Sequence, residues 1–392
     1  MTSTPVIGII GATGAAGRAA VRALADTRLW DTPAPTLRLG GRRLEATSQV
    51  AAALPTGDGM PEVDVRHLDI DDPAGLSDFC AGCTVLLSCA GPSYQIGDRL
   101  ARAAVEAGAE FADVSGYDPV HGQLLDLDLP ARGRAAVLSA GIYPGLSALF
   151  PRWLAGQGVG EPVRLSAYVG GLEEATLGSA ADLVLSIGDG AVWGSSGAAL
   201  AAWRHGGRTE HQLRVVEDIE VPFFPDRLTA QPFLSTEAER LAADLRLAEL
   251  DWYNVFIGTH MRTALNRLRG GQPADDEELE RSARALMRAC SLDVGGRTPY
   301  YVMAYWMDGR DAGEPTSVSG VLRTHDTFEV TGAVGALAAR ALLRGDVPPG
   351  VHFAAEVLEP ADTVERIRRL KSVTALEAIT GSASEEFEAG VL

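Results

Sequence analysis

The residues near the amino terminus form a glycine-rich pattern of the kind that binds phosphate. The apolar run Val6–Ile10 has the composition of a buried strand and leads directly into GATGAAG at 11–17. Gly11 permits a tight turn, Gly14 lets the backbone approach a ligand, and Gly17 lets the following helix pack close to the strand. The N–H groups and dipole of that helix then favour an anion. The pattern predicts the pyrophosphate turn of a dinucleotide site; a tight turn that binds nothing is the alternative.

The end of the next strand decides which dinucleotide fits. An NAD site places Asp or Glu about 20 residues after the glycines, whereas this chain has LGGRR at 39–43. The guanidinium groups of Arg42 and Arg43 suit the 2′-phosphate of NADP through charged, forked hydrogen bonds. Cations at the start of a helix oppose its dipole unless a bound anion offsets them. We therefore predict NADP rather than NAD; two incidental arginines at a solvated helix start are the alternative.

Small and polar residues follow the later strands of the same region. Open α/β sheets bind ligands outside the carboxyl ends of their strands, so these turns are expected to converge on one crevice. Asp69 and the backbone of Ile70 are expected beside the adenine, and the small residues after the fourth strand allow close approach of the ribose and nicotinamide. The turn residues predicted to line the crevice are Asp69, Ile70, Ala90, Gly91, Pro92, Ser115 and Gly141.

The proton donor must be a tyrosine, a histidine, an acid or a water, because Lys371 is the only lysine. Lysine Schiff bases, a P-loop lysine and Tyr-x-x-x-Lys relays are thereby excluded for the first 370 residues. Tyr143 is the preferred donor because it follows the sixth strand, beside the expected nicotinamide. Tyr94 and His121 follow the fourth and fifth strands and are the further candidates. Each of these side chains has a plain packing role as its alternative.

Other signals are set aside. Cys80 and Cys83 form a C-x-x-C pair, but a structural zinc site needs four ligands and no second pair follows. The seven histidines show no ligand spacing, so no metal is expected. The acidic start of 275–278 and the arginines behind it complement a helix dipole and predict a solvated helix. Gly194-Ser195-Ser196-Gly197 lacks the spacing of a serine hydrolase.

Strand-like and helix-like segments alternate through the first 140 residues, with six strands in all. This spacing predicts an α/β fold, with an N-terminal Rossmann-type, doubly wound parallel sheet. After Gly141 the segments become longer and less regular, which predicts a second α+β domain with a mixed sheet. We expect a cofactor domain over 1–150 and a substrate and dimerisation domain over 151–325. The helices within 326–392 are expected to pack back on the first domain, because a parallel sheet needs cover on both faces.

The overall charge narrows the class of partner. The chain has 52 acidic and 34 basic residues and a formal net charge of −18, which disfavours nucleic acid and anionic membranes. The start of the chain lacks a signal-peptide pattern, and its apolar runs are too short to span a bilayer. Four cysteines do not form a disulfide framework. The expectation is a cytoplasmic protein that acts on a small molecule.

Five stretches of the chain match motifs of a known family. They are positions 11–17, GPSYQIG at 91–97, EFADVSGY at 110–117, AGIYPGLSAL at 140–149 and GDVPPGVHFAAEVL at 345–358. Through them the chain resembles the saccharopine dehydrogenase-like reductases, which include carboxynorspermidine dehydrogenases and imine- or opine-type reductases. Some of these motifs also resemble the trans-acting enoyl reductases. The family pattern Gly-x-Asp-Pro-Gly reads Gly-Ile-Tyr-Pro-Gly here, with Tyr143 in place of the acid.

The resemblance implies a Rossmann domain, a mixed-sheet second domain, a homodimer and NADPH-dependent reduction of a carbon–nitrogen double bond. Arg42 would take the 2′-phosphate, and 90–92 would lie along the nicotinamide ribose. The residues that the resemblance places on the pyrophosphate are Gly11, Thr13, Gly14, Ala15, Ala16 and Gly17. Two alternatives stay open. One is reduction of an activated carbon–carbon or carbonyl bond, and the other is a non-catalytic NADP-binding sensor or scaffold.

Overall fold

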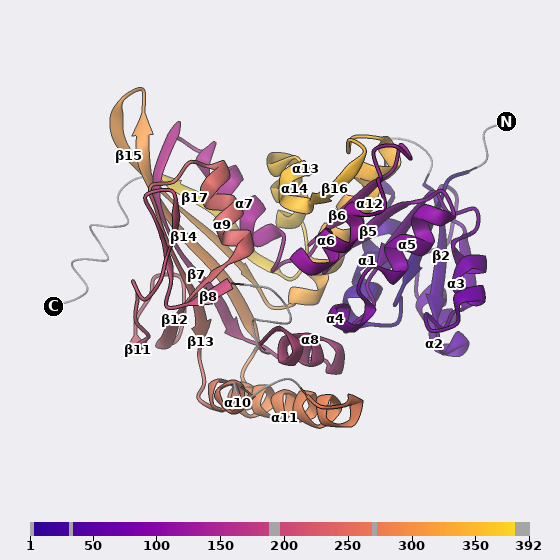
Figure 1. Ribbon diagram of the computed structural model, residues 1–392, viewed down its shortest axis with the longest axis horizontal. Helices are drawn as coiled ribbons and strands as arrows, with labels where there is room; N and C mark the ends of the chain where they lie inside the picture. Colours follow the sequence, from indigo (N-terminus) through magenta and orange to yellow (C-terminus); the bar gives the residue numbers. More distant parts are fainter. Residues whose placement is uncertain (1–3, 31–33, 188–196, 269–272, 381–392) are drawn as a thin grey trace. The chain divides into compact units, whose positions relative to one another are not determined.

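The computed structural model describes residues 4–30, 34–187, 197–268 and 273–380. Its contacts divide the chain into two compact units, each formed from two stretches of sequence. The first unit contains 1–146 and 328–359, and the second contains 147–327 and 360–392. Figure 1 shows the helices and strands of both. Among the described residues, every helix is too short or too polar to cross a membrane.

The first unit is built on a parallel sheet. In the described residues it has seven strands, in the order β16-β6-β5-β4-β1-β2-β3. The strands are β1 (Val6–Ile10), β2 (Thr36–Gly41), β3 (Val63–His67), β4 (Val85–Ser88), β5 (Glu110–Asp113), β6 (Ala135–Leu138) and β16 (Gly350–Phe353). All neighbours are parallel. Most central strands are continuous apolar runs, as expected for strands that helices cover on both faces. The predicted α/β class and Rossmann sheet are confirmed.

Helices connect successive strands of this sheet. They are α1 (Ala15–Ala25), α2 (Leu44–Ala52), α3 (Pro73–Cys80), α4 (Ser93–Ile96), α5 (Arg99–Glu106), α6 (Asp118–Leu125), α12 (Thr327–Arg344) and α13 (Ala354–Val357), with a 3-10 turn at Thr27–Leu29. Their apolar sides bury the sheet, and Leu76, Phe79, Leu100 and Leu124 belong to one core cluster with Phe111 of β5. Because the strands are parallel, their carboxyl ends lie at one edge of the sheet, and this core fixes the sheet in place.

A buried arginine ties β2 to its neighbours. The side chain of Arg38 is 10% exposed and pairs with Asp64 of β3, Nε to Oδ2 at 2.9 Å. Its Nη1 donates to the carbonyl oxygens of Phe79 and Ala81 at 2.7 Å each. A buried guanidinium is tolerated only when its donors have acceptors of this kind. Arg38 therefore has a structural role.

The second unit contains a mixed sheet. In the described residues it has ten strands, with the path β10-β9-β13-β7-β14-β15-β17 and a branch of β12 with β8 and β11. The strands are β7 (Glu161–Leu172), β8 (Gly197–Ala199), β9 (Ala202–Arg204), β10 (Gly207–Thr209), β11 (Val216–Ile219), β12 (Leu228–Ser235), β13 (Glu249–Phe256), β14 (Tyr300–Asp311), β15 (Glu314–Thr324) and β17 (Val373–Thr380). Only β13 and β7 pair in parallel among the described ladders of this sheet.

The helices of the second unit are α7 (Leu146–Ala155), α8 (Leu177–Ile187), α9 (Thr236–Asp244), α10 (His260–Leu268), α11 (Asp276–Val294) and α14 (Pro360–Arg368). Trp252 and Tyr305 lie on one face of the sheet, where Tyr305 contacts Phe150 of α7 edge-on. On the opposite face, Tyr168 stacks on Tyr253 with ring centroids 4.7 Å apart. Figure 1 shows α7 and α9 together beside the strands.

The expectation for 326–392 was wrong in part. Residues 328–359 belong to the first unit as expected, but they add a strand, β16, parallel to β6. Residues 360–380 belong to the second unit, because β17 pairs antiparallel with β15. A prediction of helices alone missed both strands, since GVHF at 350–353 is short and β17 carries little alternation of apolar residues. Pairing with a distant neighbour makes both into strands.

Candidate active site

The glycine-rich turn lies at the point where the strand order of the first sheet reverses. The chain runs from β1 to β2 and β3 on one side, and then returns to β4 on the other side of β1. Gly11 has φ +78°, and a Cβ on it would lie 2.7 Å from the carbonyl oxygen of Cys89, in the turn after β4. Only glycine combines that conformation with that approach. This reversal is where parallel α/β sheets bind dinucleotides.

The start of α1 has the features of an anion site. Gly14 is the N-cap and supplies no side-chain hydrogen bond, and the first turn of the helix contains no acid. A Cβ on Gly17 would collide with the carbonyl oxygen of Gly11, so the helix packs directly against the turn. The first N–H groups of a helix are unsatisfied unless capped, and they carry the positive end of its dipole. The local geometry that pyrophosphate requires is therefore present over the predicted residues 11–17.

Two cations lie beside this turn. Arg42 and Arg43 are exposed, and among the described residues neither guanidinium has an ion-pair or hydrogen-bond partner. The end of β2 adjoins the glycine turn, because a Cβ on Gly41 would be 3.7 Å from Cγ2 of Thr13. A 2′-phosphate on a dinucleotide bound at the turn would supply the missing counter-charge. The predicted roles of Arg42 and Arg43 stay predictions, which this geometry favours.

Arg18 is a third guanidinium that sequence reasoning passed over. It directly follows Gly17, and its Nη1 donates to the carbonyl oxygen of Thr13, in the middle of the turn. This hydrogen bond holds the turn in place and brings a positive charge beside it. The signal in the sequence is an arginine immediately after the last glycine of the motif, but its direction depends on the folded turn.

The turn after β3 is held by hydrogen bonds to the rest of the first unit. The N–H of Leu68 donates to Gly41 at 3.1 Å, which fixes the turn to the end of β2. Asp69 accepts a hydrogen bond from the backbone N–H of Asp71 at 3.1 Å, in an Asx turn. The carbonyl oxygen of Ile70 accepts from Nη1 of Arg99 at 3.2 Å. The two residues predicted to contact adenine therefore lie in a turn that the protein itself holds rigid.

The turn after β4 contains residues 90–92, predicted beside the nicotinamide ribose. It begins next to β1, where Cys89 donates its N–H to the carbonyl oxygen of Ile10 at 2.9 Å. Tyr94, in α4, is 7% exposed and stacks on Tyr117 with centroids 4.7 Å apart. A ring so covered acts chiefly as packing between the turns after β4 and β5. Tyr94 stays a candidate donor, with a defined structural role.

The turns after β5 and β6 are joined by hydrogen bonds. Ser115 donates its N–H to the carboxylate of the buried Asp113 at 2.8 Å, and Ser139 donates its hydroxyl to Gly116 at 2.8 Å. The N–H of Ile142 donates to Oγ1 of Thr331 in α12 at 3.3 Å. Tyr143, the preferred donor, follows directly and is half-buried. Gly91–Pro92 and Tyr143–Pro144 are both cis peptide bonds.

Gly141 was predicted to line the cofactor crevice and His121 to be a candidate proton donor, and the two lie in different surroundings. A Cβ on Gly141 would lie 2.6 Å from the carbonyl oxygen of Val114, so the turns after β5 and β6 meet there. His121 is half-buried in α6, and its ring stacks on Phe353 of β16 with centroids 4.9 Å apart. That stack links the helix to the outermost strand, on the far side of β6 from β4. His121 thus has a clear packing role, and its catalytic role remains untested.

The residues set aside earlier have structural explanations. Burial raises the pKa of the Cys80 thiol to about 12 and also raises that of Cys83, so neither thiol is reactive. Asp293 accepts hydrogen bonds from the N–H groups of His260 and Met261 at 3.0 and 2.8 Å and thereby caps α10. In the described part of the chain, no group of three potential metal ligands comes together. Ser195 and Ser196 lie outside the described residues.

Glu173, which sequence reasoning missed, is a partly buried carboxyl group in the second unit. It follows the end of β7 and accepts a hydrogen bond from Oγ1 of Thr327 at 2.7 Å. Burial, and then the neighbouring Asp326, raise the pKa of Glu173 to about 7. Such groups are candidates for proton transfer near neutral pH. A Glu-Glu pair after a strand gives no sign of this in the sequence, because the burial comes from distant elements.

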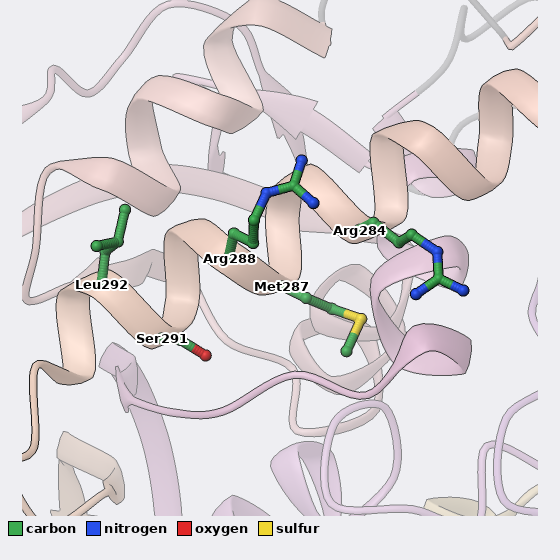
Figure 2. A pocket seen from close by; sticks show the side chains of 5 residues that line it. All are labelled: Arg284, Met287, Arg288, Ser291 and Leu292. Atoms are coloured by element: carbon green, nitrogen blue, oxygen red, sulfur yellow. The ribbon is translucent and has the colours of Figure 1, made fainter.

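A pocket of about 490 Å³ lies on α11 and is lined by Arg284, Met287, Arg288, Ser291 and Leu292 (Figure 2). Arg284 is paired with Glu280, and Ser291 donates to Glu174 at 2.6 Å. Glu277 and Arg281 form a second i,i+4 ion pair on α11. The solvated helix that the charge pattern predicted is therefore confirmed. Since two of the three polar side chains that line the pocket already have protein partners, we assign it no function.

The raised pKa of Glu173 predicts a pH-dependent stability. The folded state binds this proton more tightly than the unfolded chain, so the carboxylate costs stability as the pH rises from about 4.5 to about 7. Glu173→Gln removes that cost, at most about 3 kcal/mol. We expect the variant to exceed the wild type in stability at pH 8 and to match it near pH 4.5, in urea unfolding curves. Glu174→Gln is the control; the same pH dependence there would contradict the assignment to Glu173.

The free guanidinium of Arg42 predicts a cofactor preference. Arg42→Ala should weaken NADPH binding about 10- to 100-fold by removing charged hydrogen bonds to the 2′-phosphate, while NADH binding stays unchanged. Fluorescence titration of both nucleotides measures this. Arg132→Ala, before β6 and thus at the amino end of a strand, is the control. Equal affinities of the wild type for NADPH and NADH would contradict the assignment.

The chain is similar to known proteins in its first unit and in its fold. Residues 7–133 match the family model of the saccharopine dehydrogenase NADP binding domain. No curated protein sequence matches the chain significantly. The whole fold resembles that of apo saccharopine dehydrogenase (L-Glu forming) from Saccharomyces cerevisiae, with TM-score 0.65, 13% identity, and coverage of 96% of this chain and 100% of that one. At this identity the likeness concerns the fold.

Two other solved structures align with lower scores. The DAP dehydrogenase of C. glutamicum in complex with DAP has TM-score 0.44 and 15% identity, over 91% of this chain and 95% of that one. An engineered D-amino acid dehydrogenase bound to NADP+ has TM-score 0.43 and 15% identity, with the same coverages. The family match and the glycine turn coincide in the first unit. Residues 7–133 are therefore similar to the saccharopine dehydrogenase NADP binding domain, and the cofactor that this match indicates is NADP(H).

Proposed function

We propose that the protein is an NADPH-dependent oxidoreductase that reduces the carbon–nitrogen double bond of a small-molecule imine. The observation that carries the proposal is the glycine turn at the strand-order reversal, with the exposed Arg42 and Arg43 beside it. The match to the saccharopine dehydrogenase NADP binding domain supports the cofactor. The resemblance to imine- and opine-type reductases favours carbon–nitrogen reduction.

The residues of the first unit hold and orient the dinucleotide. When bound, NADPH supplies the hydride, and the imine carbon accepts it while the nitrogen gains a proton. The N–H groups of residues 15–17 would bind the pyrophosphate, since that of Gly14 donates to Gly11 within the turn. Residues 90–92 and the turns after β5 and β6 would enclose the nicotinamide half. A protonated imine is the form that is activated for hydride attack, so a weak acid beside the nitrogen, which supplies that proton, is sufficient. The protein then needs chiefly to position the acceptor and exclude water.

Tyr143 is our proposed proton donor. It is half-buried in a turn that hydrogen bonds fix to α12, through Ile142 and Thr331. A phenolic hydroxyl is protonated at neutral pH and can donate. Tyr94 and His121 are kept as secondary candidates, although the ring of each is stacked on another aromatic ring. Their roles in packing favour Tyr143.

One observation favours a second function. Related reductases carry an acid where this chain has Tyr143, so an amino-acid-like substrate engaged by that acid is not expected here. The alternative is reduction of an activated carbon–carbon or carbonyl bond, as in enoyl reductases. A non-catalytic NADP-binding sensor is the remaining alternative; it predicts cofactor binding without turnover.

Parallel assays of NADPH oxidation test the reaction. Cyclic imines, enones and keto acids are supplied separately to the full chain, and we expect turnover with imines. Turnover with enones alone would overturn the imine assignment, and binding of NADPH without turnover of any class would support the sensor. Tyr143→Phe keeps the ring and removes the proton, so we expect kcat to fall about 10²-fold or more with NADPH affinity unchanged. Unchanged turnover would exclude Tyr143 as the donor.

We also propose a homodimer in which the second unit supplies the interface. The rings of Tyr168, Tyr253 and Trp306 are partly exposed on one face of its sheet, and aromatic residues are enriched at protein interfaces. Trp306→Glu is expected to shift a dimer to a monomer in size-exclusion chromatography with light scattering. Leu125→Glu, at an exposed apolar position of the first unit, is the control. A wild type that is monomeric at micromolar concentration would contradict the proposal.

The proposed location is the cytoplasm. The described structure contains four free cysteines, Cys80, Cys83, Cys89 and Cys290, and three of them are buried. Unbridged thiols agree with a reducing compartment. The proposed partners are the small-molecule substrate and a second copy of the chain, and the formal net charge of −18 argues against nucleic acid and anionic membrane.

A further inference from the structure

A single guanidinium spans the turns after β3 and β4. Arg99 begins α5, and its Nη1 donates to the carbonyl oxygen of Ile70 at 3.2 Å and pairs with the carboxylate of Asp71. Its Nη2 donates to the carbonyl oxygen of Gln95, in α4, at 3.5 Å. In the sheet, β3 and β4 are separated by β2 and β1. Arg99 therefore connects two turns whose strands are not neighbours.

These two turns flank the place where the adenine of the cofactor belongs. The pyrophosphate turn follows β1, and the arginines for the 2′-phosphate follow β2, so the adenosine half extends toward β3. The nicotinamide half lies on the other side, toward β5 and β6. The Arg99 guanidinium lies between the turn after β3 and Gln95 of α4, which follows the residues 90–92 predicted beside the nicotinamide ribose. We place the adenosine half between these two segments.

The side chain of Arg99 is partly open to solvent. Its side chain is 39% exposed, whereas the Asp71 carboxylate that pairs with it is 75% exposed. The three protein acceptors bind donors at the edge of the guanidinium, and a planar guanidinium can stack on a ring while its edge donors stay bonded. An exposed pair of this kind adds little to stability, so stability alone does not account for a bridge between the two turns.

We propose that Arg99 is a positioning residue for the adenine of NADP(H): it holds the turns after β3 and β4 together and stacks its guanidinium plane on the base. The proposal rests on NADP binding and not on which bond is reduced, so it stands or falls separately from the imine assignment. It gives the adenine a rigid wall before the cofactor arrives, which lowers the ordering cost of binding.

The test uses fragments of the cofactor with the full chain. We expect Arg99→Leu to weaken 2′,5′-ADP and NADPH by the same factor, about five- to tenfold, in calorimetric titrations. NMNH, which lacks the adenosine half, should bind the variant and the wild type alike. Arg102→Leu, on the same helix and paired only with Asp98 among the contacts described, is the control and should bind 2′,5′-ADP normally.

A second variant separates stacking from charge. Arg99→Lys keeps the positive charge but has no plane, so it should show most of the loss seen with leucine. Thermal unfolding of the apo variants checks the fold; if the leucine variant fails to fold, the lysine variant carries the test. Wild-type affinity of Arg99→Leu for 2′,5′-ADP, or full recovery by lysine, would overturn the proposal.

Discussion

The site depends on the close approach of two backbone turns at the reversal of the strand order. The turn after β1 meets the turn after β4 so closely that Gly11 has no room for a Cβ beside the Cys89 carbonyl. The same turn also admits the start of α1 only because Gly17 lacks a side chain. The residues that we propose to bind the cofactor are arranged around this contact. The uncapped helix start lies at its centre, the cations after β2 lie on one side, and the turns after β5 and β6 lie on the other.

Charge is distributed unevenly in relation to that contact. The chain is strongly acidic overall, with a formal net charge of −18, and many of its described arginines are paired with carboxylates. Arg38 illustrates this use, since its donors are consumed within the fold. Arg42 and Arg43 at the far end of the same strand have no such partner among the described residues. An anionic ligand completes this arrangement, and Glu173 is its opposite, a carboxyl placed where burial opposes its charge.

Much of the first unit could be predicted from the sequence, because most of its strands are apolar runs. The glycines at 11, 14 and 17 each meet a specific steric requirement of the turn after β1. The six strands before residue 140 and the turns behind them are where the pattern indicates. The second unit was harder. The strands β12 and β13 were not recognised, and β16 and β17 were missed, because their pairing partners lie far away in the sequence. The packing contacts of Tyr94 and His121 could not be predicted either, since their stacking partners Tyr117 and Phe353 become neighbours only in the folded sheet.

The sequence by itself determined the fold class, the dinucleotide turn and the preference for NADP, since local chemistry decides all three. The spacing of the glycines at 11–17, the absence of an acid after the second strand, and the pair Arg42 and Arg43 can all be identified from adjacent residues. Only the tertiary structure decided that 360–380 join the second unit, that Arg99 bridges two turns, and that burial raises the pKa of Glu173 to about 7. These properties arise from burial and from contacts between remote segments, which a local pattern does not encode.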